Sequence, residues 1–546
     1  MVSIGQSRRS TPIYLLFPPP ARPKTFEDEE DDFEQSPSIP QPLPPPPDLI
    51  TLLRSEFPPS PRQAERLVYL LHQATRHITP TKDQSTSIRT NYALLPKRSS
   101  YLKTVETNSS LLAPIRMLPP EILVDIFALC DSGSGCVSNL DAPIVFMQVC
   151  SSWRKLVLGS PRLWSSPCVV DGGDHLDRSF AHFTNCLEKS ADSPLTISAV
   201  LYQNFDKRTP KLPDIFSQVV EHASRWRSLK LYVPLHSLGS TLSRIPTGGV
   251  PLLRQFMVWD TSPHEGGRNG VPGIGFLKDA PSLRVVHLRA PRQTLDGIEL
   301  PWNQLTQLLI DCCDEPSPSP SSLDLVTLLR ACPNLIHCHL DLQSSTPTVI
   351  PTTNLTLTHI NLHHLHLRIF HPTPFLPSLT LPNLQTLHIE CLHHKSPWDP
   401  FSLSSFLSRS RCPLEALTMI LSQISTQELI ECFSHLRHVV SVQVNAYDTT
   451  LDFDPVLASL VVPHTTGSTN PPQCPNLKKI IIFGPHFTPQ PFIDFVRSRR
   501  YPIANHQGVT RLEIVQAVAP SEVCQYLREE LEGCRRDGLK LVLRDL

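Results

Sequence analysis

The stretches CPNLIHCHL (332–340), LPNLQTLHI (381–389) and CPNLKKIII (474–482) share one pattern: Pro-Asn-Leu, followed by apolar residues three and five positions after the leucine. Apolar residues spaced two apart predict a short strand with one buried face. The pattern recurs outward in both directions, with Trp, Phe, Ile, Val, Met or Cys replacing some leucines. Units start at Trp226, Leu253, Leu283, Leu305, Leu335, Leu362, Leu384, Leu414, Leu436 (a weaker match), Leu477 and Val509.

The spacing of these units indicates a repeat architecture. From Trp226 to Leu436 the intervals are 27, 30, 22, 30, 27, 22, 30 and 22 residues, which bracket the period of about 20–29 residues that is typical of leucine-rich repeats. One repeat cannot cover its own apolar face, so neighbours must stack. We therefore expect an α/β leucine-rich-repeat solenoid over residues 190–546, within an α+β multidomain protein.

Helical segments precede several of the predicted strands, as the outer face of such a solenoid requires. They are Leu323–Leu329, Phe401–Leu407 and Glu428–Phe433. The interval from Leu436 to Leu477 breaks the period. It contains either a degenerate repeat around Leu457–Val462 or an inserted loop around Thr465–Gln473.

The histidines and cysteines of the repeats have structural interpretations. In a strand, His364 and His366 project to one face while Leu365 and Leu367 project to the other. No carboxylate or cysteine lies within that strand, so a polar outer face is favoured and no metal site is predicted. The 15 cysteines include no Cys-x-x-Cys pair, which predicts buried, reduced thiols, Cys338 and Cys391 among them.

The N-terminal part of the chain has a different composition. Residues 1–60 are rich in proline and acidic residues, so disorder is expected. The tract Pro42–Pro47 is interpreted as a linker, with a polyproline ligand as the alternative. Ser60 and Gln63 form a predicted capping box for a short amphipathic helix, which with a linker occupies 61–98. Its predicted apolar stripe is Ala64, Leu67, Val68, Leu71, Ala74 and Ile78.

A compact helical module is predicted over residues 99–170. Leu118-Pro119-Pro120-Glu121 starts a helix, because proline is tolerated in a first turn, and its apolar face holds Ile122, Leu123, Ile126 and Phe127. A Gly- and Ser-rich loop, Asp131–Asn139, separates it from a second helix. Ile144, Val145, Val149, Trp153, Leu156 and Val157 follow at helical spacing, and Leu163-Trp164 closes the module.

This block, LPPEILxxIF at 118–127, VCxxWxxL at 149–156 and Leu163-Trp164, resembles the F-box, in particular the F-box-like type common in mushroom-forming fungi. The resemblance implies a non-enzymatic substrate-recognition subunit of a cullin–RING (SCF-type) ubiquitin ligase. The F-box of that family binds a Skp-type adaptor, and the second domain binds the protein target. Carried over by position, the adaptor-binding residues are Leu118, Pro119, Ile122, Leu123, Ile126, Val149, Trp153 and Leu156.

Two alternatives remain open. The first is a leucine-rich-repeat scaffold with a degenerate F-box and no ligase role. The second is an enzyme, which is disfavoured because the sequence contains no catalytic motif; no catalytic residue and no cofactor are predicted. A net charge of −1 predicts neither nucleic-acid nor membrane binding, and the basic clusters Arg497/Arg499/Arg500 and Arg535/Arg536 are interpreted as solvated surface. No signal peptide or membrane span is apparent, so a cytoplasmic or nuclear location is expected.

Overall fold

The computed structural model separates the chain into two compact units, Met1–Met117 and Leu118–Leu546. The described residues are 59–78, 111–130, 143–170, 176–201, 212–234, 239–261, 274–290, 298–312, 325–342, 356–369, 376–391, 402–421, 424–446, 451–462, 472–484, 486–501 and 508–545, with single positions between 51 and 109. The predicted disorder over 1–60, the polyproline tract and the linker after residue 78 fall almost entirely outside them.

The first unit contains the predicted amphipathic helix, α2 (Pro61–Ile78), and a short 3-10 helix, η1 (Pro114–Met117). The Ser60 backbone N–H donates to Gln63 Oε1 at 2.9 Å, which is one half of the predicted capping box. Leu67 packs with Leu111 in a small buried cluster. Val68, which was predicted on the apolar stripe, is instead 55% exposed, because Leu67 and Ala74 define the buried side of the helix.

The second unit begins with a helical module of four short elements. They are α4 (Pro120–Leu129), α5 (Ile144–Val149), α6 (Ser151–Leu158) and η2 (Pro161–Trp164). The single helix predicted after residue 143 is thus two helices. Cys150 separates them with an extended backbone, φ −158° and ψ 168°, and its side chain caps α6.

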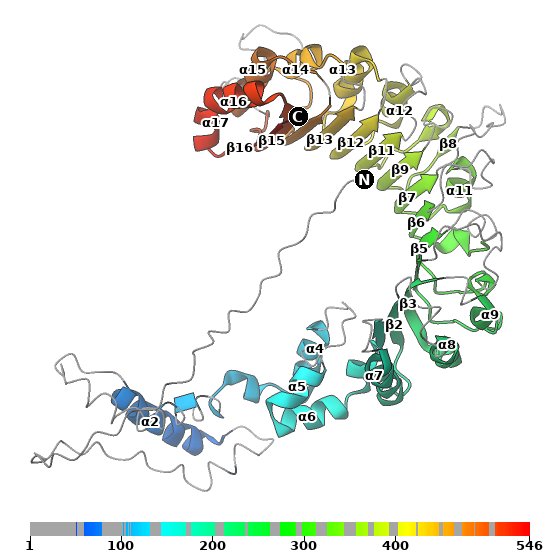
Figure 1. Cartoon of the computed structure of the whole chain (residues 1–546), viewed down its shortest axis with the longest axis vertical. Coiled ribbons are helices and arrows are strands. Elements are labelled where there is room, and N and C mark those ends of the chain that lie inside the picture. Colours follow the sequence, from blue (N-terminus) through cyan, green and yellow to red (C-terminus); the bar gives the residue numbers. More distant parts are fainter. Residues whose placement is uncertain are drawn as a thin grey trace, which may run out of the picture. The chain divides into compact units, whose positions relative to one another are not determined.

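The rest of the second unit is built on one sheet of 14 strands, all parallel and in chain order (Figure 1). The strands are β1 (Cys168–Val170), β2 (Leu195–Val200), β3 (Trp226–Val233), β4 (Gln255–Asp260), β5 (Val285–Ala290), β6 (Gln307–Cys312), β7 (His337–Leu342), β9 (His364–Ile369), β11 (Thr386–Cys391), β12 (Ala416–Leu421), β13 (Ser441–Ala446), β14 (Lys479–Phe483), β15 (Ile514–Ala519) and β16 (Lys540–Asp545). A separate pair, β8 (Leu357–Thr358) and β10 (Leu379–Thr380), lies outside this sheet. The architecture is α+β: a small helical region followed by a large parallel sheet.

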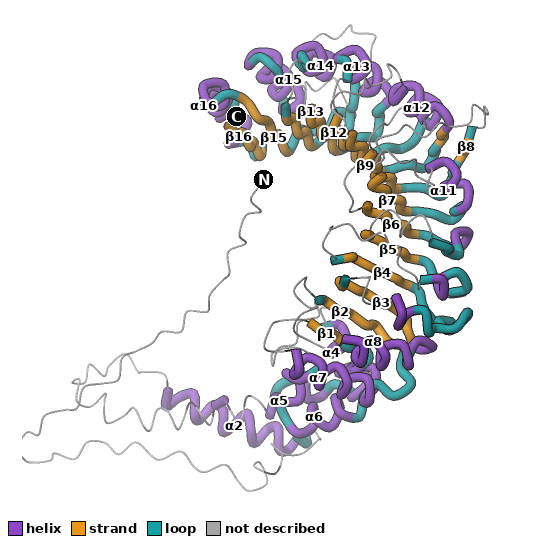
Figure 2. Tube along the Cα trace, turned by 45° about the vertical axis from the view of Figure 1, so that its right-hand side comes forward, coloured by secondary structure: helices purple, strands orange, loops and turns teal. Residues whose placement is uncertain are grey.

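Helices and 3-10 turns connect the strands and lie along one side of the sheet, leaving its other face on the inner side of an arc (Figure 2). They are α7 (Leu176–Lys189), α8 (Leu212–Glu221), η4 (Ala223–Arg225), α9 (Gly239–Leu242), η6 (Gly275–Leu277), η7 (Trp302–Gln304), α11 (Leu325–Ala331), η8 (Leu376–Ser378), α12 (Ser402–Ser410), α13 (Thr426–His435), α14 (Asp454–Leu460), α15 (Pro489–Arg500), α16 (Ser521–Glu530) and α17 (Glu532–Arg536). The three predicted helical segments correspond to α11, α12 and α13. None of the helices described is both long and apolar enough to cross a lipid bilayer.

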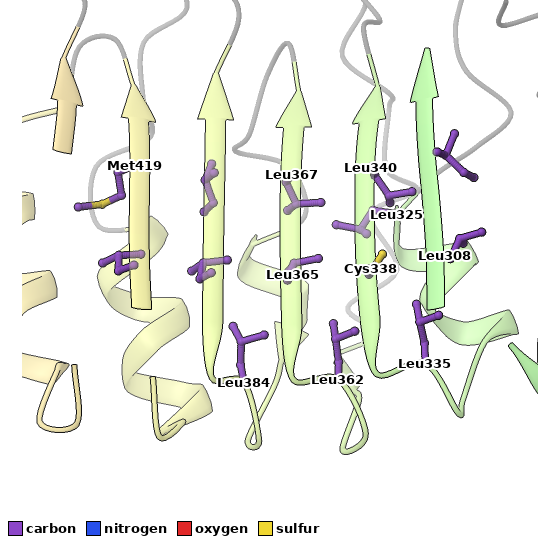
Figure 3. Close-up of a cluster of buried hydrophobic side chains, with 14 of the residues drawn as sticks. Leu308, Leu325, Leu335, Cys338, Leu340, Leu362, Leu365, Leu367, Leu384 and Met419 are labelled. Atoms are coloured by element: carbon purple, nitrogen blue, oxygen red, sulfur yellow. The ribbon is translucent and has the colours of Figure 1, made fainter. Parts of the chain in front are cut away.

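The core consists of the repeated apolar side chains, stacked in register between the strands and the helices (Figure 3). Cys338, Leu365 and Leu387 form one continuous row, and each is at most 3% exposed. The leucines that start the repeats, such as Leu362 and Leu384, lie below the strands and are fully buried. The predicted strand phase is therefore confirmed here, and so is the predicted burial of Cys338 and Cys391.

The Pro-Asn-Leu lead-in has a structural reason. The amide of Asn334 donates to the Asn303 carbonyl at 2.8 Å, and that of Asn383 donates to the Ile360 carbonyl at 2.7 Å. Asn476 repeats the contact with the Arg437 carbonyl at 3.3 Å. Each asparagine thus hydrogen-bonds a backbone carbonyl that the sheet leaves open in the preceding repeat.

The phase of two predicted repeats was wrong by three residues. Val442 pairs with Leu417 and Val515 pairs with Ile480, so the true units start at Val439 and Leu512 and not at Leu436 and Val509. At Val509 both phases fit the apolar pattern. At Leu436 the fifth position falls on Ser441, and only the phase from Val439, with Val442 and Val444, fits the pattern fully. The long interval before Leu477 contains the helix α14 in its described part, and β13 pairs directly with β14.

The interpretation of Arg499 and Arg500 as solvated was also wrong, because they are 0% and 6% exposed. Arg499 donates to the carbonyls of Leu460, Cys474 and Gln473. Arg500 pairs with Asp537 at 3.0 Å. Arg535 and Arg536 are exposed, as predicted, and both pair with Glu532.

Candidate functional site

Helix α4 separates its apolar residues onto two faces. Pro120 at the first turn and Glu121 near the positive helix end favour its start. Leu123 and Phe127 are 7% and 2% exposed and belong to the core of the helical module. Ile122 and Ile126 face solvent, at 47% and 36% exposure. The helix therefore presents apolar surface that the described part of the module does not cover.

The exposed face of α4 extends further than the sequence analysis expected. Leu129, which was not among the predicted site residues, is 85% exposed. It follows Ile122 and Ile126 at the spacing i, i+4, i+7, which places the three on one stripe. That spacing was available in the sequence; only burial distinguishes this stripe from that of Leu123 and Phe127. Ile122, Ile126 and Leu129 are called the α4 stripe below.

Leu118 and Pro119 form the approach to α4. Pro119 is exposed and is the N-cap residue, with φ −56° and ψ 147°, and its carbonyl accepts from the Leu123 N–H at 3.1 Å. Leu118 is half-buried and packs against the module core. Only Pro119 has an extended backbone here, and α4 begins directly after it, as expected for a proline that presets φ.

The second half of the module supplies mainly packing. Trp153 and Leu156 are half-buried against the core, and the Trp153 ring lies 4.7 Å from that of Phe127, which stacks on Phe146 at 4.2 Å. Val149 is 57% exposed at the end of α5. Of the eight predicted residues, Pro119, Ile122, Ile126 and Val149 are therefore exposed, while Leu123 is buried.

The module continues directly into the sheet. The Trp164 indole N–H donates to the Val157 carbonyl at 2.8 Å, and Cys186 of α7 completes the cluster around Leu123 and Phe127. The Thr196 N–H donates to the Ser165 carbonyl at 2.8 Å, where η2 leads into β1. The helices are thus anchored to a rigid sheet.

Side chains on the inner face of the sheet form two rows in register. The first row contains His287, His339, His366 and His388, on β5, β7, β9 and β11, with Leu309 of β6 between His287 and His339. Two residues further along each strand, a second row contains Arg289, Asp311, Asp341, Arg368 and Glu390.

Both rows have internal contacts. The rings of His339 and His366 lie 3.9 Å apart and those of His366 and His388 lie 3.8 Å apart. Arg368 pairs with Asp341 at 2.9 Å and Glu390 at 3.4 Å. Burial, reinforced by the charges of His339, His388 and Arg368, lowers the pKa of His366 to about 3. Burial also lowers the pKa of His287, His339 and His388. The histidine row is therefore uncharged at neutral pH.

A family model described as F-box-like matches residues 115–170. This range covers α4 to β1 and contains every predicted adaptor-binding residue. No curated protein matches the chain significantly. Residues 115–170 are thus an F-box-like domain. Such domains in general bind Skp-type adaptors, and proteins that contain them are typically non-enzymatic subunits that recognise substrates for ubiquitin ligases.

Proposed function

We propose that this chain is the substrate-recognition subunit of a cullin–RING ubiquitin ligase of the SCF type. Its F-box-like domain binds a Skp-type adaptor, and through it a cullin scaffold, while the sheet binds a protein target. Such a subunit makes and breaks no bond. It raises the concentration of target lysines near the conjugating enzyme.

The observation that carries this proposal is the exposed α4 stripe within a domain that matches the F-box-like family. Ile122, Ile126 and Leu129 are 47%, 36% and 85% exposed on one helix, whose opposite side is committed to the core. An apolar groove on the adaptor is the partner that such a stripe fits. Pro119, Leu118 and Val149 extend the proposed contact, while Leu123, Trp153 and Leu156 act mainly by holding the helices together.

We also infer that residues 190–546 are a leucine-rich-repeat domain, of the kind that fungal F-box proteins carry, and that it binds the target. The strand-by-strand stacking, the buried leucines and the asparagine contacts support this inference. The inner face of the sheet offers a large surface of half-buried side chains, which suits recognition of another protein.

The proposal is tested with the full chain and a purified Skp-type adaptor. Ile122→Ala with Ile126→Ala removes two exposed anchors, so we expect the adaptor affinity to fall by about 30- to 1,000-fold. Unfolding should hardly change, because neither side chain is in the core. The Leu118→Ala/Pro119→Ala pair should also abolish capture, with some loss of stability from the half-buried Leu118.

Two controls make this test specific. Tyr526→Ala, an equally exposed apolar position on α16, should leave adaptor binding unchanged. Leu123→Ala should lower stability by about 2–5 kcal/mol, the cost of a core truncation. An unaltered adaptor affinity in the folded Ile122/Ile126 variant would contradict the ligase role and favour the scaffold alternative.

A further inference from the structure

Three side chains on neighbouring strands converge on the inner face of the sheet. His366 lies on β9, opposite His388 of β11, and Glu390 follows His388 by two residues, so that both project to the same face. One ligand atom from each of the three lies within 4.8 Å of the other two. The strand of His366 contains no carboxylate of its own, and the neighbouring strand β11 supplies Glu390.

We propose that His366, His388 and Glu390 form a binding site for a divalent transition-metal ion of the zinc type. Two imidazoles and a carboxylate are a ligand set that Zn²⁺ uses. Mg²⁺ and Ca²⁺ prefer oxygen ligands, so the two imidazoles argue against them. This inference does not depend on the proposed ligase role, since it concerns only the sheet.

The bonding state of His388 agrees with this assignment. Its Nε2 is buried and has no hydrogen-bond partner among the described residues. Buried polar atoms are normally hydrogen-bonded, and a bond to a metal ion would give this nitrogen a partner.

The geometry requires a modest rearrangement. Ligand atoms around a tetrahedral ion lie about 3.3 Å apart, given metal–nitrogen bonds of about 2.0–2.1 Å. Closing the gap from 4.8 Å requires rotation of the side chains about their own bonds, which also tilts the stacked rings of His366 and His388. Glu390 must exchange Arg368 for the ion. The Arg368 guanidinium lies 3.4 Å from Glu390 and 2.9 Å from Asp341. Arg368 therefore keeps its shorter contact, with Asp341, when Glu390 turns to the ion.

Three protein ligands leave a tetrahedral ion one open position, filled by water or by a group of a bound partner. A hollow of about 440 Å³, with His287, His366 and His388 among its lining residues, lies on the same face. It gives a partner's side chain room to approach the ion. The site is therefore open to a partner, unlike a closed structural zinc site with four protein ligands.

The test is titration of the full-length, chelator-treated chain with Zn²⁺ alone, followed by calorimetry. We expect the native sequence to bind one more equivalent than the triple variant His366→Asn/His388→Asn/Glu390→Gln. Each single substitution should weaken that equivalent at least tenfold, since outer-shell changes alone typically cost 10- to 100-fold. With Co²⁺ as the probe, the visible absorption of the bound ion should disappear in the same variants.

His364→Asn is the matched control, because His364 lies on the same strand and face as His366 but has no third ligand beside it. It should bind Zn²⁺ like the native chain. Identical isotherms for the native chain and the triple variant would overturn the proposal, as would an equal loss in His364→Asn. If the triple variant does not fold, Glu390→Gln, which conserves shape, decides the question alone.

Discussion

Arg499 shows how one buried charge can join three segments of the chain. Its guanidinium donates to the carbonyls of Leu460, Cys474 and Gln473, and the side chain is fully buried. Burial lowers its pKa to about 10, so it remains protonated at neutral pH. The planar fork of five N–H donors suits this arrangement, which a lysine could not reproduce.

Replacing Arg499 by methionine should therefore be strongly destabilising. It leaves three carbonyls without this donor, those of Leu460 and Cys474 in buried contacts, at about 1–3 kcal/mol for each buried group left unsatisfied. We expect the free energy of unfolding to fall by about 3 kcal/mol or more, as measured by denaturant titration. Arg497→Met is the control: Arg497 is exposed, and its pair with Glu530 should contribute no more than about 1 kcal/mol. Equal effects would contradict the role assigned to Arg499.

At the scale of the element, each strand divides its side chains between two environments. On β11, Leu387 and Ile389 are fully buried, whereas His388 and Glu390 face the inner side of the sheet. Gln385 lies just before the strand and is half-buried. The division results from the period of two in the strand and persists from β3 to β15 through the parallel register.

This division predicts opposite outcomes for neighbouring substitutions. Leu387→Asp places an unpaired charge among stacked leucines and should cost several kcal/mol, because a buried charge without a partner is expensive. Gln385→Ala should change the free energy of unfolding by about 0.5 kcal/mol or less. Thermal and denaturant unfolding of the two variants measures the contrast. Comparable losses in both would show that the strand phase is wrong.

At the scale of the whole molecule, the F-box-like domain and the sheet are not independent. The cluster around Phe127 and Trp164 includes Cys186 of α7, and β1 is only three residues long and pairs with β2. The Lys189 ammonium lies 5.5 Å from the centre of the Trp164 ring. Helix α4 and the first strands of the sheet therefore share packing contacts through α7.

This continuity predicts that the F-box-like domain gains stability from the sheet. A fragment of residues 111–170 lacks Cys186 and β2, so it should unfold at a lower denaturant concentration than a fragment of residues 111–201. Trp164 fluorescence, with Trp153 replaced by Phe in both fragments, reports the difference. Identical midpoints would show that the domain folds without help from the sheet.

The sequence by itself determined the strand phase of most repeats, because the spacing of apolar residues decides which face of a strand is buried. It also located helix α4 and the order of the F-box-like motif, since both depend on residues close together in the chain. It could not separate Ile122 from Leu123 as surface and core, because both belong to one broad apolar face until neighbouring helices cover one side.

Only the tertiary structure decided which residues from different repeats meet. His366, His388 and Glu390 converge because parallel register aligns two strands that start 22 residues apart, and Arg499 is buried because three distant carbonyls surround it. The displaced start at Val509 has the same cause, because two phases fit the local pattern there and pairing with Ile480 selects one. Local spacing fixes a side chain's direction, whereas its neighbours depend on how successive repeats stack.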